Sequence, residues 1–283
     1  MDALVGEGFT VRVFDKARPP NDKVDWFRGD LLSKEDVDDA TQDVETVFHL
    51  AAVADVNVSV ADPELCLAVN ELGTLSMLRA CLGREVERFI LASTVWVYGK
   101  ASGVVTEDTP IPPPIDVYTK TKIGQEHLVY SWCRSHSLSY TILRYDIPYG
   151  PGMRGNMAIA NFVRRAMRKE PVTIYGDGNQ GRCWVFITDL AQGNCLASKE
   201  TARNETINLA GKEFVTISEI LDLLEKEFGS LPVRHEPPRP SDFKGVKTSI
   251  EKAQNLIGWS PETSFAEGLS RYITYIRGLH SSS

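Results

Sequence analysis

The chain has 283 residues, of which 42% are hydrophobic and 24% are charged, and its 31 basic and 38 acidic side chains give a net charge of -7. This composition is ordinary for a soluble globular protein, and the length allows a sizeable buried core. Because no block of basic residues is present, the sequence argues against binding to nucleic acid, which needs a concentrated positive surface.

Cysteine usage and hydrophobicity argue against further classes of protein. The five cysteines are irregularly spaced and include no Cys-x-x-Cys pair, which favours reduced thiols over a disulfide framework or a zinc site. No run approaches the roughly 18 apolar residues of a membrane span, and the N-terminus does not resemble a signal peptide. We therefore expect a cytoplasmic protein without metal or membrane contact.

Short apolar strands alternate with helices over the first 150 residues. Strands are expected at residues 10–14, 45–50, 88–92 and 140–143, and helices at residues 34–40, 63–82 and 118–135. This alternation is typical of βαβ units around a parallel sheet, whose strands end at a common crevice. The sequence therefore predicts an α/β fold with a doubly wound parallel sheet. Asp15, Ser93, Thr94 and Asp146 follow the expected strand ends.

After about residue 150 the pattern becomes looser and richer in turns. Glycine-rich turns occur at residues 150–152 and 176–179, and helices are expected at residues 158–168, 217–228 and 265–276. We expect residues 151–283 to form mainly a smaller α/β lobe over the crevice. About residues 183–215 are expected to return to the main sheet, which would make the lobe discontinuous.

Two short segments carry a chemical signal. Tyr118 and Lys122 are four residues apart, which on a helix places them on one face, one turn apart. A lysine ammonium favours a phenolate, so we expect the pKa of Tyr118 to lie below its ordinary value of about 10. Ser93 and Thr94 end an apolar strand and supply two hydroxyls. Together these residues predict the oxidation and reduction of an alcohol; the alternative is an incidental Tyr and Lys on a surface helix.

With these motifs in place, the chain resembles the extended short-chain dehydrogenase/reductases, and among them the nucleotide-sugar epimerase/dehydratase family, over nearly its whole length. Besides the two segments above, the resemblance rests on Gly29-Asp30-Leu31, His49-Leu50-Ala51-Ala52, Asn70-Glu71-Leu72-Gly73-Thr74, Leu143-Arg144-Tyr145, Tyr149-Gly150-Pro151, Ile174-Tyr175-Gly176-Asp177-Gly178, Arg182, Thr188-Asp189-Leu190-Ala191, Arg239-Pro240-Ser241-Asp242 and Gly258-Trp259-Ser260-Pro261. Each match is modest, but their order and spacing together are specific.

The resemblance implies a Rossmann-type NAD-binding domain at residues 1–150 and a nucleotide-sugar-binding lobe in the remainder. It implies NAD as the cofactor, a nucleotide sugar, expected to be UDP-linked, as the substrate, and a homodimer formed through the helices at 63–82 and 118–135. The family opens with a strand and a Gly-x-x-Gly-x-x-Gly turn that holds the cofactor pyrophosphate. Here Gly6 and Gly8 are interpreted as the stop of the helix that follows that turn.

The missing turn leaves two interpretations open. Either the sequence is truncated, which we favour, or the protein has lost cofactor binding. The missing strand would lie in the middle of the sheet, so its loss is expected to be structurally severe.

The resemblance also implies the cofactor contacts. Asp15 would bond the adenosine ribose hydroxyls and favour NAD over NADP, although Lys16 and Arg18 keep NADP open. Asp30 would contact adenine, with Leu31 beside it; the alternative for both acids is an exposed loop position. The other expected cofactor contacts are Leu50, Ala51, Ala52, Asn70, Ser93, Tyr118 and Lys122. His49 is expected to be structural.

For the chemistry, the resemblance implies Tyr118 as the acid/base, Lys122 as its partner on the nicotinamide ribose, and Thr94 as the contact to the reacting sugar hydroxyl. The expected substrate contacts are Thr94, Tyr175, Arg182, Arg239 and Asp242. Planar guanidinium groups suit a diphosphate because they bond its oxygens in pairs. The alternative for the two arginines is a solvated surface.

The residues after Thr94 select among the reactions of the family. Its 4,6-dehydratases carry Asp-Glu there as an additional acid and base, whereas this chain has Val95 and Trp96. We therefore predict a 4-epimerase that oxidises C4 transiently and reduces it again on either face. A deoxysugar 4-ketoreductase or a dehydratase-family member is the enzymatic alternative, and a non-catalytic Rossmann-like binding protein is the alternative of another class. Asp146 and Ile147 depart from the family pattern and leave the sugar open.

Overall fold

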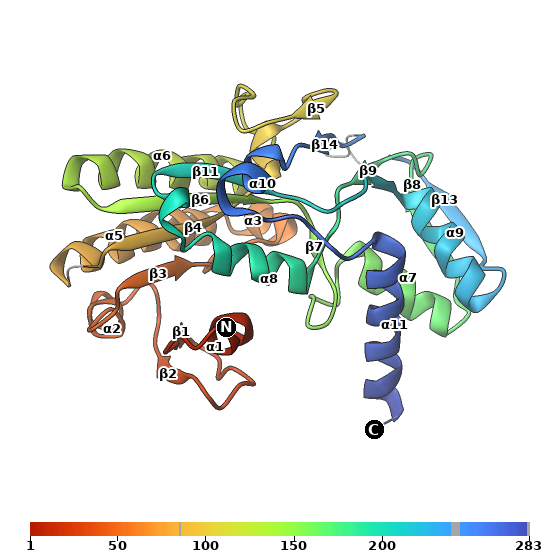
Figure 1. Cartoon of the computed structure of the whole chain (residues 1–283). Coiled ribbons are helices and arrows are strands. Elements are labelled where there is room, and N and C mark those ends of the chain that lie inside the picture. Colours follow the sequence, from red (N-terminus) through yellow and green to blue (C-terminus); the bar gives the residue numbers. More distant parts are fainter. Residues whose placement is uncertain (85, 239–243, 282–283) are drawn as a thin grey trace.

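The computed structural model describes residues 1–84, 86–238 and 244–281 (Figure 1). Its main sheet has four parallel strands in the order β11-β6-β4-β3. These strands are β3 (Thr46–His49), β4 (Arg88–Thr94), β6 (Ser139–Tyr145) and β11 (Glu205–Leu209). All seven residues of β4 are buried because neighbouring strands flank it on both edges and helices cover both faces.

Alternate residues of β4 pack into two separate hydrophobic cores, one on each face of the main sheet. Phe89 and Leu91 pack on one face with residues of α5 (Gly73–Gly83) and α6 (Val117–His136). Ile90, on the other face, packs with residues of α8 (Ile187–Leu196) and α10 (Glu251–Ile257). Helices on both faces of a parallel sheet confirm the predicted doubly wound α/β fold.

The first two strands stand apart from the main sheet. β1 (Arg12–Asp15) and β2 (Asp25–Arg28) form a parallel pair of their own, and in the described part of the chain neither pairs with a main-sheet strand. α1 (Asp2–Gly6) precedes them and α2 (Lys34–Ala40) follows. Gly8 has a φ of +87° just after α1, as expected for a helix stop. The sequence pattern did not predict β2, a four-residue strand with a charge at each end.

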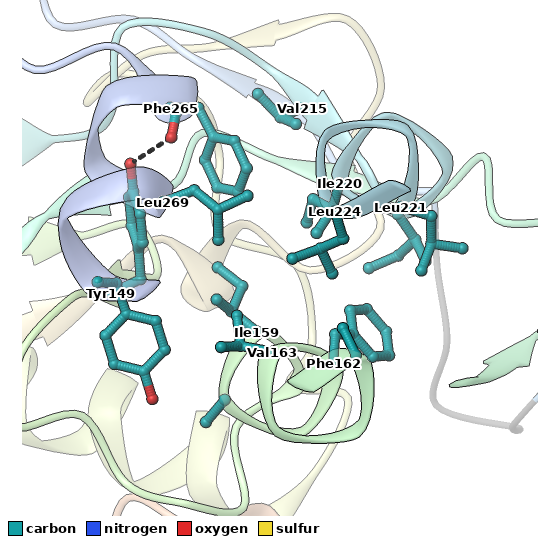
Figure 2. Close-up of a cluster of buried hydrophobic side chains, with 14 of the residues drawn as sticks. Tyr149, Ile159, Phe162, Val163, Val215, Ile220, Leu221, Leu224, Phe265 and Leu269 are labelled. Carbon is teal, nitrogen blue, oxygen red and sulfur yellow. Dashed lines mark hydrogen bonds between the residues drawn. The ribbon is translucent and has the colours of Figure 1, made fainter. Parts of the chain in front are cut away.

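A second group of elements, in the C-terminal half of the chain, packs around a core of its own. α7 (Ala158–Met167), α9 (Ile217–Phe228) and α11 (Phe265–Ser281) surround a separate hydrophobic core. Figure 2 shows Ile159 and Val163 of α7 pointing toward Leu224 of α9 and Leu269 of α11. The Tyr149 hydroxyl donates to the Phe265 carbonyl at 3.2 Å and ties this core to the end of the main domain.

Several shorter elements complete the described structure. The short strand pairs are β8 (Val172–Tyr175) with β13 (Val233–Glu236), β9 (Gly181–Arg182) with β12 (Val215–Thr216), β7 (Pro148–Tyr149) with β10 (Val185–Phe186), and β5 (Val104–Val105) with β14 (Lys247–Thr248). The remaining helical turns are α3 (Val56–Ala61), α4 (Pro63–Leu67), η1 (Ala68–Leu72), η2 (Val95–Tyr98) and η3 (Glu200–Ala202). β11 and α8 lie within residues 183–215. β11 is a strand of the main sheet, and α8 packs against one face of that sheet.

One helix in the described ranges, Pro63–Gly83, is long and apolar enough to cross a membrane by length and composition alone, with a mean hydropathy of 1.3. The window average tolerates polar residues such as Asn70, which is why the sequence shows no unbroken apolar run. Of that window, 44% is buried inside the fold. A core helix passes the same test, so this is weak evidence for a membrane span.

Candidate active site

The end of β4 and the first turns of α6 meet at the carboxyl edge of the main sheet. Asp116 caps α6, its side chain accepting from the Thr119 N–H at 2.7 Å. This start directs Tyr118 and Lys122 toward β4, where the Lys122 Nζ donates to the Ala92 carbonyl at 2.9 Å. Lys122 is buried, with 3% of its surface exposed.

Thr94 joins this pair from the last position of β4. Its side chain hydrogen bonds with Tyr118, and its Oγ1 also accepts from the Trp96 N–H at 3.2 Å. The structure therefore brings together the three residues that the sequence assigned to catalysis. An alcohol held between Thr94 and Tyr118 would have a proton acceptor within hydrogen-bonding reach.

The expected lowering of the Tyr118 pKa is wrong. Burial raises the pKa of Tyr118 to about 12, and the hydrogen bond from Thr94 opposes this only in part. Burial also lowers the pKa of Lys122 to about 8, against the opposing charge of Glu126. The sequence spacing correctly placed the two groups near each other, but it carries no information about the cost of desolvating them.

Ser93 points away from the reacting edge. It is buried, and its Oγ donates to the Glu126 Oε1 at 2.5 Å. Glu126 in turn accepts from Arg144 of β6, at 3.0 Å from Nε and 2.7 Å from Nη2. Glu126 was not predicted as a site residue from the sequence, although its position one turn beyond Lys122 on α6 was available as a signal.

The segment after β3 offers an open surface for a cofactor. Leu50 is 58% exposed and Ala51 is also exposed, while Ala52 is half-buried. His49, which precedes them, is buried and bonded to the Thr74 hydroxyl at 2.9 Å. Burial, together with the charge of Lys122, lowers the pKa of His49 to about 3, so the ring is neutral, as expected for a structural histidine.

Two of the predicted cofactor contacts, Asn70 and Leu31, have buried side chains. Asn70 is completely buried; it accepts from the Val53 N–H at 2.7 Å and donates to the Thr121 hydroxyl at 2.8 Å. These bonds fix the loop after β3, and the contact of Asn70 with the cofactor stays a prediction. The Leu31 side chain is also buried, in the core with Val37, which leaves only its backbone for such a contact.

The two expected adenosine-side acids lie at the ends of the separate strand pair. Asp15 is exposed, and its Oδ1 accepts from the Ala17 N–H at 2.8 Å. Asp30 accepts from the Leu32 N–H at 3.0 Å and pairs with Lys16 at 2.8 Å. The Lys16 bond, followed by the Leu32 bond, lowers the pKa of Asp30. Asp30 thereby engages one of the two cations that kept NADP open.

The residue types along this edge fit NAD. Carboxylates at Asp15 and Asp30 suit ribose hydroxyl and adenine donors, and the Tyr118 hydroxyl and Lys122 ammonium suit the second ribose. Small or exposed side chains after β3 leave room between these two ends. Among the described residues no group of three His, Cys, Asp or Glu side chains could hold a metal ion.

The expected substrate side lies next to Thr94. The Arg182 guanidinium lies over the Trp96 ring, 5.9 Å from its centre, and Tyr175 ends β8. Arg239 and Asp242, also predicted for substrate binding, lie outside the described residues. Trp96 follows Thr94 by two positions, so this contact places a cation beside the catalytic end of β4.

Asp146 is a further buried group at this edge that the sequence singled out. It is 2% exposed and accepts from the Thr248 hydroxyl at 3.0 Å. Burial raises the pKa of Asp146 to about 6, against the opposing effects of its hydrogen bonds and of the Arg182 charge. The carboxylate thus links the end of β6 to the segment of β14.

Comparisons with known proteins agree with this geometry. The model of the "NAD dependent epimerase/dehydratase family" matches residues 1–210. A UDP-glucuronate 4-epimerase of Thermodesulfobacterium geofontis is 34% identical over 83% of this chain and 73% of its own length. The structure of MoeE5 in complex with UDP-glucose and NAD has a TM-score of 0.92 at 32% identity, covering 100% of this chain and 94% of that one. UDP-glucuronic acid 4-epimerase from Bacillus cereus, with UDP-glucuronic acid and NAD, gives a TM-score of 0.91 at 32% identity, covering 98% and 94%.

Proposed function

The chain belongs to the NAD dependent epimerase/dehydratase family, and we propose that it is a cytoplasmic NAD-dependent 4-epimerase of UDP-hexoses or UDP-hexuronates. The observation that carries this proposal is the joining of Thr94, Tyr118 and Lys122 at the end of β4. The UDP-sugar complexes of structurally similar proteins support the substrate class.

In the proposed reaction Tyr118 acts as the phenolate, which accepts the proton of the C4 hydroxyl and becomes the phenol, while Thr94 holds that hydroxyl in place. Lys122, one turn further along α6, favours this phenolate form by its positive charge. When bound, NAD supplies the hydride acceptor at C4 and, once reduced, the hydride donor. After the 4-keto sugar has rotated in the site, Tyr118 returns the proton to the C4 oxygen, so the product is the C4 epimer.

The diphosphate stays anchored while the sugar turns. Arg182 lies beside Trp96 and is the described cation best placed for this role, and Arg239 is proposed as its partner from the sequence. Asp242 is proposed to hold the nucleotide ribose and Tyr175 to lie against the base. A fixed anchor remote from the reacting carbon allows either face of the ketone to meet the hydride.

The dehydratase alternative lacks an acid and base. At the two positions after Thr94 the structure has a buried Val95 and a half-buried Trp96, and neither can exchange a proton with the sugar. A ketoreductase would use the same three residues as an epimerase, so cofactor stoichiometry separates these two reactions. A non-catalytic binding protein would interconvert nothing.

We also propose a homodimer through Pro63–Gly83 and α6. Exposed apolar side chains on these helices support it: Leu65 is 41%, Leu72 63% and Tyr130 47% exposed. Burying such a surface stabilises association. Sedimentation analysis of the purified protein measures the stoichiometry, and a monomer at all concentrations would contradict the proposal.

The experiment for the activity uses purified protein with UDP-glucose or UDP-glucuronate and a catalytic amount of NAD, followed by NMR of the anomeric proton. The expected result is the C4 epimer without net NADH. Stoichiometric consumption of NADH with a 4-keto substrate alone would favour the ketoreductase. Absence of any conversion, with intact nucleotide-sugar binding, would favour the non-catalytic protein.

A further inference from the structure

Three residues occupy one face of α6 in consecutive turns: Tyr118, Lys122 and Glu126. The mechanism above uses the first two. Glu126 is 5% exposed and makes three hydrogen bonds, one from the Ser93 hydroxyl and two from the Arg144 guanidinium. A buried carboxylate held from two strands at once is costly unless its geometry is well satisfied.

The network around Glu126 continues away from the site and is closed by further bonds. The Arg144 Nη1 donates to the Tyr98 hydroxyl at 2.9 Å, and that hydroxyl donates to the Asn208 Oδ1 at 2.7 Å. The Asn208 backbone N–H donates to the Glu107 carboxylate at 2.7 Å. These bonds fix the Arg144 guanidinium, and its two hydrogen bonds to Glu126 in turn hold that carboxylate in a fixed place.

Lys122 needs a compensating charge because it is buried and its one hydrogen bond in the described structure goes to the neutral Ala92 carbonyl. The titratable groups that act on it come from three elements: Glu126 on its own helix, Cys66 on α4 and His49 on β3. His49 is neutral, and burial raises the pKa of Cys66 so that its thiol is neutral as well. Glu126 is thus the carboxylate that favours the charged ammonium.

Arg144 also prevents an unwanted contact. A carboxylate four residues beyond a lysine on one helix is close enough to pair with it directly. Here both Glu126 oxygens are taken up by Arg144 and Ser93, and the Lys122 ammonium stays on the Ala92 carbonyl at the end of β4.

We propose that Glu126 is a positioning residue for the reaction: held by Arg144 one turn beyond Lys122 on α6, it presents a fixed negative charge to the Lys122 ammonium and orients the Ser93 hydroxyl. The inference rests on the proposed epimerase only where it invokes catalysis. The effect of Glu126 on the charge of Lys122 does not depend on any enzymatic activity.

The direct test follows the titration of Lys122 by NMR in protein labelled with 13C at the lysine ε carbon, with the signal assigned through Lys122→Met. The wild-type pKa is expected at about 8. In Glu126→Gln it falls by about one unit, a roughly tenfold loss of proton affinity, because an opposite charge is removed. An unchanged or raised pKa would overturn the inference.

Glu71→Gln is the matched control, because Glu71 pairs with Lys120 of the same helix at 2.6 Å on its exposed side. The Lys122 titration should not move in it. If Glu126→Gln does not fold because Arg144 is left unpaired, Glu126→Gln with Arg144→Met removes both charges. A smaller fall in the Lys122 pKa is expected, because the positive charge of Arg144 is removed as well, and an unchanged pKa counts against the inference.

The second readout is the pH profile of kcat/KM. An alkaline limb caused by loss of the Lys122 proton should move to lower pH in Glu126→Gln by the shift that NMR measures. A purely structural role would lower the rate and leave the limb in place, which would contradict positioning. If the NMR shift occurs in a protein without epimerase activity, the proposed function fails and the role of Glu126 toward Lys122 stands.

Discussion

The two ends of the predicted cofactor edge differ in construction. At the catalytic end, β4 is buried along its whole length, and Ser93, Glu126 and Arg144 are joined by bonds of 2.5–3.0 Å. At the adenosine end, β1 and β2 pair only with each other among the described strands, and no residue of either is fully buried.

The two regions therefore have different expected roles: one holds the reacting groups, and the other recognises the adenosine part of the cofactor. The reacting groups need fixed distances and altered pKa values, which a buried network provides. The acids that would bind ribose and adenine lie on an exposed strand pair, a unit that is marginally stable by itself. We therefore expect substitutions in the catalytic region to affect rate and stability strongly, and those in the strand pair to affect mainly affinity.

The largest effect is expected from Tyr118→Phe. Removal of the hydroxyl takes away the proton acceptor, so turnover should fall about 10²- to 10⁴-fold, while affinity for the UDP-sugar stays nearly unchanged. Rate assays and calorimetric binding measure the two quantities. Full retention of activity would exclude Tyr118 as the acid/base.

The next effect compares a cation from each region. Arg144→Met leaves Glu126 buried and unpaired, and should lower the free energy of unfolding by about 3–5 kcal/mol. Lys16→Met breaks the exposed ion pair with Asp30, in which Lys16 is 70% exposed, and should cost about 0–1 kcal/mol. Urea denaturation measures both variants, and equal losses would erase the contrast between the regions.

A pH effect of about 2–3 kcal/mol is expected from Asp146, since its folded pKa of about 6 exceeds the ordinary 3.8. The folded protein holds this proton more tightly than the unfolded chain, so the stability it contributes is present at low pH and lost as the pH rises through 6. Asp146→Asn lacks this loss. Its free energy of unfolding, relative to wild type, should therefore increase from pH 4 to pH 7; a constant difference would contradict the buried acid.

The smallest effect is expected from Asp15→Ala. Loss of the ribose acceptor should weaken NAD binding by about tenfold, or roughly 1.4 kcal/mol, and leave the free energy of unfolding nearly unchanged because the side chain is exposed. Titration of NAD by fluorescence measures the affinity. A large loss of stability in this variant would show that the strand pair is more tightly integrated than the hydrogen bonds indicate.

Local sequence signals predicted the elements that have strong local causes. The helix expected at residues 217–228 has those bounds because Thr216 and Glu219 form a capping box at its start. The helix that carries Tyr118 and Lys122 likewise begins at a capping aspartate, and its periodicity placed both side chains beside β4. β2 was not predicted because only its two central residues are apolar and a charged residue stands at each end.

The rest of the site depends on tertiary contacts that no local pattern contains. The raised pKa of Tyr118 comes from desolvation in the folded structure, so spacing alone gave the wrong direction. The grip of Arg144 on Glu126 joins positions 18 residues apart in sequence. Asn70 was assigned to the cofactor by resemblance, whereas its burial depends on packing between helices of the main domain.

The central claim is transient oxidation at C4 with return of the same hydride. The most direct measurement incubates the protein and catalytic NAD with a UDP-sugar carrying deuterium at C4, and follows the label by NMR and mass spectrometry. The expected product is a C4 epimer that retains its deuterium, with no net reduced cofactor. An epimer that has exchanged its deuterium for solvent hydrogen, or reduced cofactor formed in proportion to product, would contradict it.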